Sequence, residues 1–188
     1  MIKTRDWRRT KAMWISVLEK RTGEGLNAWN RRIRKQTFDD ARQLRVWLSG
    51  QNVSGYAQQL LVMEHSGYPE FILATAEELI EKQYANCPQL RAIYDAIIDA
   101  AAACGEVTVQ ARKTYVSLIA PRRTFARVQR TTKTRVDLGL RLAGQRPGGR
   151  LQPSNIHETM RLQISLATPD EVDSEVQKWL RRAYVDNS

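Results

Sequence analysis

The chain has 188 residues, of which 42% are hydrophobic and 27% are charged, and its formal net charge is +10. This composition is typical of a soluble globular protein with one sizeable core or two small domains. No apolar run approaches the roughly 18–20 residues that a membrane helix needs, so we expect no membrane partner. The charged N-terminus lacks a following apolar segment, so we expect no secretory signal.

The cysteines and histidines are too few and too scattered for a metal site. Cys87 and Cys104 fall near the two ends of one predicted helix, which is too far apart for a disulfide. The two histidines, His65 and His157, have no cysteine at metal-ligand spacing. We therefore expect a reduced, cytoplasmic protein with no structural metal and no cofactor.

The positive charge is concentrated in two segments. Residues 1–45 contain thirteen Lys or Arg against five Asp or Glu, and residues 107–150 contain eleven against one, Asp137. The segment between them is acidic, and residues 151–188 are slightly acidic. Clustered basic residues are the electrostatic footprint of a protein that binds a polyanion, although solubility charges can also look clustered in one dimension.

The first half of the chain predicts helices, because apolar residues recur every three or four positions. Thr10 is expected to cap the first helix and Gly23 to end it. Thr37 with Asp40 has the spacing of a capping box for the third. The four expected helices cover residues 10–22, 26–35, 38–50 and 54–66.

The second half predicts helices followed by strands. Thr75 and Glu78 have capping-box spacing, and a helix is expected from Pro88 to Gly105. From Val107 the apolar period changes to two, which indicates an antiparallel meander. A Gly/Pro-rich loop and a final helix beginning at Thr168 follow. The expected strands are 107–110, 113–119, 123–129, 134–142 and 159–166.

The expected fold class is therefore α+β. We predict an N-terminal helical bundle in residues 1–70 and a linker with a short helix in residues 71–87. Residues 88–188 are predicted to form a small antiparallel sheet module flanked by two helices.

Two sets of sequence segments resemble known bacterial modules. "EKRTGEGLNAWNRRI" and "VWLSGQNVSGYAQQLLVMEH" resemble domain of unknown function 4287, although the aromatic pair usual before its Ala-Gln is reduced to Gly55-Tyr56. "PQLRAIYDAI", "RKTYVSLIAPRRTFARV", "TRVDLGLRL" and "EVQKWLRRAYVDNS" resemble domain of unknown function 5655. The resemblance implies a family and no particular activity. The second module also appears behind nuclease-like domains, which implies a nucleic-acid setting.

The strands of the second half predict one aliphatic face and one basic face. Aromatic rings among cations suit single-stranded nucleic acid, because bases stack on the rings while the cations contact phosphates. Tyr115 and Phe125 are the candidate stacking residues; alternatively, a helix covers this face and both rings belong to the core. The candidate phosphate contacts are Arg112, Lys113, Arg122, Arg123, Arg127, Arg130, Lys133 and Arg135.

The helical half offers a second set of cations. A helix-turn-helix reader is disfavoured because residues 54–66, where the recognition helix would lie, contain no Lys or Arg. The helix over residues 26–35 carries cations that could still contact phosphates. These are Arg31, Arg32, Arg34 and Lys35.

Catalytic interpretations have weaker support. "GQRPGGR" lacks the Gly-Lys-Ser/Thr ending of a phosphate loop, and Glu64 and His65 are adjacent helical residues that point apart. Asp137 lies among arginines, which suits a structural salt bridge better than a general base. The sequence thus favours a non-enzymatic protein that binds nucleic acid, preferably single-stranded, or another polyanion. The alternatives are a protein–protein or small-anion module, including a homo-oligomer contact, and an enzyme with dispersed catalytic residues.

Overall fold

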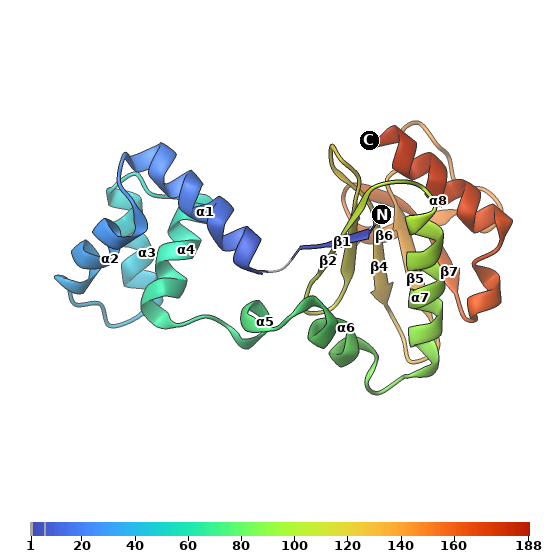
Figure 1. Cartoon of the computed structure of the whole chain (residues 1–188), viewed down its shortest axis with the longest axis horizontal. Helices are drawn as coiled ribbons and strands as arrows, with labels where there is room; N and C mark the ends of the chain where they lie inside the picture. The colour runs from blue at the N-terminus through green and yellow to red at the C-terminus, as the bar shows by residue number, and fades with distance from the viewer. Residues whose placement is uncertain (1, 6) are drawn as a thin grey trace. The chain divides into compact units, whose positions relative to one another are not determined.

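The computed structural model describes residues 2–5 and 7–188, which form two compact units (Figure 1). One unit is helical and comprises residues 7–74. The other comprises residues 75–188 together with residues 2–5. These boundaries differ from the predicted ones because the N-terminal residues join the sheet and the helix of the predicted linker packs on it. The predicted α+β class is confirmed.

The helical unit is built around its fourth helix. Leu60 and Leu61 of that helix are fully buried, and it packs against the three helices that precede it. Trp14, Trp29 and Leu48 contribute to the same core. The helices are α1 (Trp7–Thr22), α2 (Leu26–Arg34), α3 (Ala41–Gly50), α4 (Gly55–Ser66) and α5 (Glu70–Leu73).

Two helix starts differ from the prediction. Helix α1 begins one turn before Thr10, which lies buried inside the helix and therefore is not its cap. Helix α3 is capped by Asp40, whose carboxylate accepts a hydrogen bond from the Gln43 backbone N–H at 2.8 Å. Asp40 precedes the first helical residue and has an extended backbone, which is the geometry of an N-cap. Thr37 therefore lies before the helix and does not cap it.

A hydrogen-bonded corner joins α1 to α2. Gly23 adopts φ +72°, a left-handed conformation that glycine tolerates best. The preceding Thr22 hydroxyl donates to the Leu18 carbonyl at 2.9 Å and accepts from the Trp29 indole N–H at 3.0 Å. This corner therefore fixes the core tryptophan of α2 to the end of α1.

The second unit contains one seven-stranded sheet in the order β1-β2-β3-β4-β5-β7-β6. The predicted antiparallel meander from β2 to β5 is confirmed. Among the strands of the described residues, β1 alone is parallel to its neighbour. Strand β1 was not predicted, and β6 occupies part of the predicted Gly/Pro-rich loop. The strands are β1 (Ile2–Thr4), β2 (Val107–Ala111), β3 (Val116–Ile119), β4 (Thr124–Arg130), β5 (Val136–Leu140), β6 (Gln152–His157) and β7 (Met160–Leu166).

The two long helices of this unit cover the same face of the sheet. Helices α7 (Gln89–Ala102) and α8 (Ser174–Asp186) contact each other, and both contact β5, which is possible only from one side. They bury the aliphatic face, including Val128, Leu138 and Ile164. The shorter α6 (Ala76–Tyr84) packs near β2.

The caps of these helices are partly as predicted. The Thr75–Glu78 capping box of α6 is confirmed, with hydrogen bonds of 2.7 and 3.2 Å. The segment after Thr168 forms only a 3-10 turn, η1 (Pro169–Glu171). Helix α8 begins later because the Asp173 side chain caps it, accepting from the Val176 backbone N–H at 3.1 Å.

The opposite face of the sheet is polar and is partly covered by β6. A Cβ atom at Gly139 of β5 would lie 3.3 Å from the Ile156 side chain of β6, so β6 folds over this face. Asp137 is 2% exposed there, accepts a hydrogen bond from Ser165 at 2.6 Å and pairs with Arg135 at 3.0 Å. Its predicted salt bridge with a neighbouring arginine is thus present.

Candidate functional site

The cations predicted to share one basic face lie at two opposite ends of the sheet. Because antiparallel strands alternate in direction, the β2–β3 and β4–β5 turns share one end, while the β3–β4 turn lies at the other. Arg122 and Arg123 lie in the β3–β4 turn, and Arg127 lies between the ends in β4. The first end carries Arg112, Lys113, Arg130, Lys133 and Arg135.

The Phe125 ring lies in the core, so its predicted role in stacking is wrong. Leu118 pairs with Ala126 whereas Ile119 pairs with Thr124, which leaves Phe125 as the extra residue of a bulge. A bulge interrupts the alternation of side chains and redirects the strand. The ring is fully buried and meets the Tyr184 ring of α8 edge to face, with centroids 5.5 Å apart.

Arg127, Arg130 and Arg135 have side-chain contacts within the second unit. The Arg127 guanidinium lies 3.8 Å from the centroid of the half-buried Tyr115 ring and also donates to the Ile156 carbonyl. Arg135 pairs with the buried Asp137. Arg130 lies 3.7 Å from the sulfur of Cys87. These contacts hold the sheet and its flanks together, and they engage Arg130 and Arg135 at the end of the sheet where the β4–β5 turn lies.

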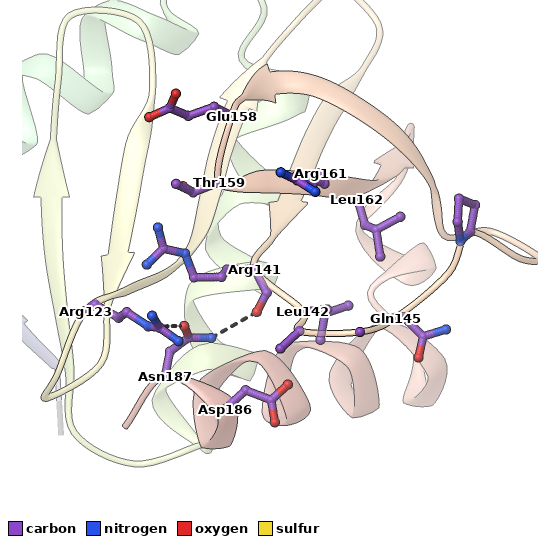
Figure 2. A pocket seen from close by; sticks show the side chains of 13 residues that line it. Arg123, Arg141, Leu142, Gln145, Glu158, Thr159, Arg161, Leu162, Asp186 and Asn187 are labelled. Carbon is purple, nitrogen blue, oxygen red and sulfur yellow. Dashed lines mark hydrogen bonds between the residues drawn. The ribbon is translucent and has the colours of Figure 1, made fainter.

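A pocket at the other end of the sheet brings three arginines together. It has a volume of about 740 Å³, and Figure 2 shows its lining side chains. Arg123 comes from the β3–β4 turn, Arg141 follows β5, and Arg161 lies on β7. Glu158 and Asp186 also line it. We call this the arginine pocket.

Asn187 orients the first of these arginines. Figure 2 shows its side-chain carbonyl accepting from Arg123 Nε at 2.7 Å and its amide donating to the Arg141 carbonyl at 2.9 Å. The amide also donates to the Ala183 carbonyl at 2.6 Å. Asn187 is fully buried. Arg122 donates to the Asp186 carbonyl at 2.8 Å at the same helix end. Arg122 and Arg123 thus bind the carbonyl-rich end of α8, which favours cations.

The arginine pocket has more positive than negative charge. Within residues 2–5 and 7–188, none of its three arginines forms an ion pair. Partial burial and the nearby charge of Arg123 lower the pKa of Arg141, which nevertheless stays charged at neutral pH. The register that pairs Leu140 with Leu162 puts Arg141 and Arg161 at the next position on neighbouring strands. Like charges opposite each other destabilise a sheet, so an anion at this point would relieve repulsion.

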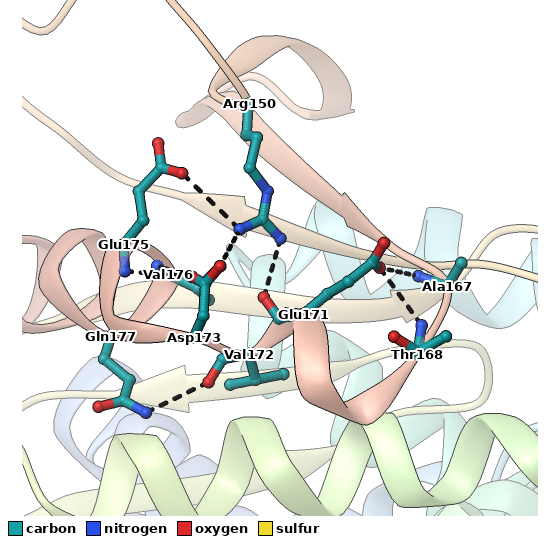
Figure 3. Close-up of polar contacts among 9 residues, drawn as sticks. All are labelled: Arg150, Ala167, Thr168, Glu171, Val172, Asp173, Glu175, Val176 and Gln177. Carbon is teal, nitrogen blue, oxygen red and sulfur yellow. Dashed lines mark hydrogen bonds and ion pairs between the residues drawn. The ribbon is translucent and has the colours of Figure 1, made fainter.

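One wall of the pocket is a loop that Arg150 holds in place. Figure 3 shows Arg150 reaching the start of α8, where it pairs with Asp173 at 2.7 Å and donates to the Glu171 carbonyl at 2.8 Å. Farther along the loop, Gln145 accepts from Arg182 of α8 at 3.2 Å. The predicted Gly/Pro-rich loop is therefore attached to η1 and to α8 at several points.

The cations predicted in the helical half belong to the other compact unit. All four are exposed in or just after the last turn of α2, where positive charge complements the helix dipole. Arg32 pairs with Glu24 and lies over the Trp29 ring. The remaining three are Arg31, Arg34 and Lys35.

A titratable cluster in the same unit was not recognised in the sequence. Glu64 of α4 pairs with Lys11 of α1 at 2.6 Å, accepts from Asn30 of α2 at 3.2 Å and contacts the Tyr68 hydroxyl. Burial alone would raise the pKa of Glu64, but these hydrogen bonds and the Lys11 charge lower it. The cluster joins helices α1, α2 and α4. Its contacts to Glu64 come from Lys11, Asn30 and Tyr68, and not from the adjacent His65.

The described part of the chain shows neither a metal cluster nor a membrane-spanning helix. Residues 2–5 and 7–188 contain no group of three His, Cys, Asp or Glu side chains that could hold a metal ion. No helix among them has the length and hydrophobicity required to cross a bilayer.

The comparisons with known proteins identify the second unit. A family model described as Domain of unknown function (DUF5655) matches residues 76–187, so the chain belongs to that family. The search of curated proteins found no match, and neither did the search of solved structures.

Proposed function

We propose that this member of the DUF5655 family is a non-enzymatic protein that binds the phosphate groups of nucleic acid. The observation that carries the proposal is the arginine pocket, which Arg123, Arg141 and Arg161 line without an ion-pair partner among the described residues. Guanidinium groups bind phosphate through paired hydrogen bonds. The net charge of +10 favours a polyanion over a small neutral ligand.

We infer a secondary contact at Tyr115. Its ring is half-buried, and Arg127 covers one side of it. Unpaired bases stack on aromatic rings and on arginine guanidinium planes, which favours single-stranded over duplex nucleic acid. Because Phe125 is buried, Tyr115, which directly precedes β3, is the remaining one of the two predicted stacking residues.

We also propose that residues 7–74 form a module of the 4287 type. The support is local: the Gly23 corner, the Trp29–Thr22 hydrogen bond and the packing of Trp47 against Trp29 involve the residues that carry the resemblance. The exposed cations at the end of α2 would add phosphate contacts.

Fluorescence anisotropy of the full chain with single-stranded and duplex oligonucleotides tests the nucleic-acid proposal. Binding should weaken with salt, because phosphate contacts release counterions. Three arginine–phosphate contacts predict a slope of about −2 in a plot of log affinity against log salt concentration for a single strand. Absence of binding at about 50 mM salt would contradict the proposal.

A further inference from the structure

We propose that the arginine pocket binds a phosphate monoester at the end of a nucleic-acid strand. This inference rests on the proposed function and makes it more specific, because it separates a strand end from the phosphodiesters along the strand. The pocket, its charges and its rigidity each support it.

The shape of the pocket fits one nucleotide better than a continuous strand. Its volume of about 740 Å³ lies within the range of sites for single small ligands, roughly 300–1,000 Å³. The segment from Leu142 to Pro147 forms part of its wall, and this segment is tied to α8.

The charges of the pocket favour one highly charged group. A phosphate monoester carries about −1.5 to −2 charges at neutral pH, more than a phosphodiester. It therefore gains more from three arginines. The carboxylates of Glu158 and Asp186, which also line the pocket, would repel a second phosphate and could accept hydrogen bonds from sugar hydroxyls.

One of the three arginines, Arg123, is positioned before any ligand arrives. Because Asn187 occupies Arg123 Nε, the two terminal nitrogens of that guanidinium form the edge that can bind two phosphate oxygens. Asn187 is itself buried and bonded to two backbone carbonyls. Arg150 fixes the far end of the loop. Such preorganisation reduces the cost of binding.

The test compares strand ends in otherwise identical probes. An internally labelled single-stranded oligonucleotide is prepared with a 5′-phosphate, with a 3′-phosphate, or with hydroxyls at both ends, and each is titrated with the full chain. We expect one phosphorylated end to bind about tenfold or more tightly than the hydroxyl form, as charge-assisted hydrogen bonds predict. Arg141→Gln should abolish this preference. Lys178→Gln, which removes an exposed cation of α8, should retain it.

The outcomes separate the inference from the proposed function. Equal binding of the three probes would overturn end recognition and leave nucleic-acid binding intact. No binding of any probe would overturn both. A free mononucleoside monophosphate that competes as strongly as the phosphorylated strand would also overturn strand-end recognition. If Arg141→Gln does not fold by circular dichroism, Arg161→Gln replaces it, since Arg161 is exposed.

Discussion

Asn187 accepts a hydrogen bond from Arg123 at 2.7 Å and is fully buried, so an arginine of the β3–β4 turn is fixed to the last turn of α8. The same amide donates to the Arg141 carbonyl, which links two arginines of the pocket through one side chain. The geometry of the pocket therefore depends on a residue that would not itself contact a phosphate.

Asn187→Ala should weaken both the fold and the binding. It leaves the Arg141 and Ala183 carbonyls without their donor, which costs about 1–3 kcal/mol of unfolding free energy. It also frees Arg123, so oligonucleotide affinity should fall. Urea unfolding and anisotropy measure the two effects. Asn155→Ala, at an exposed position of β6, is the control. Unchanged stability and affinity in Asn187→Ala would refute this role.

Gly105→Ala should destabilise the second unit. Gly105 adopts φ +150°, and an added Cβ would lie 2.4 Å from the Tyr184 hydroxyl oxygen. Backbone strain and overpacking together predict a loss of about 2–4 kcal/mol. Gly148→Ala, where an added Cβ meets nothing within 4 Å, should change stability little. Chemical unfolding of the two variants checks the difference, and similar midpoints would contradict it.

The Glu64 cluster predicts acid sensitivity of the helical unit. Because the pKa of Glu64 in the folded chain lies below its ordinary value of 4.5, ionised Glu64 stabilises the fold above that pH. This contribution is lost as pH falls from 4.5 through the lower folded pKa. Thermal unfolding followed by circular dichroism should show a smaller acid-induced decrease in Glu64→Gln than in wild type. If the unfolding temperatures of wild type and Glu64→Gln fell equally with pH, the cluster would not stabilise the folded helical unit.

Tyr115→Ala should reduce affinity for single strands more than for duplexes. Stacking contributes about 1–3 kcal/mol per base, which corresponds to a loss of about five- to 150-fold. Tyr115→Phe retains the ring and should bind like wild type. Anisotropy titrations of both variants with single-stranded and duplex oligonucleotides measure these affinities. An equal loss for single strands and duplexes would indicate that Tyr115 acts only by holding Arg127.

The sequence predicted the elements better than their spatial relationships. The change of apolar period at Val107 predicted the meander correctly, because the alternation records which side of a strand is buried. The Phe125 bulge was not visible, since it depends on how β3 and β4 pair. Strand β6 contains Pro153 and polar residues, so its pairing with β7 had no apolar signal.

The arginine pocket was only partly predictable for the same reason. Arg123 was identified from the density of cations around it. Arg141 and Arg161 are 20 residues apart in the sequence and meet only through the register of β5 with β7. The sequence did not indicate the role of Asn187, because asparagine is a common residue near the end of a helix.

The salt dependence of Arg161→Gln tests the central claim most directly. Arg161 is exposed on β7, so its loss should leave the fold intact. Anisotropy with a single-stranded oligonucleotide should show weaker binding and a log–log salt slope shallower by about 0.7, the value for one lost phosphate contact. Lys178→Gln should leave the slope unchanged. Equal slopes in wild type and Arg161→Gln would mean that the pocket does not bind the phosphates.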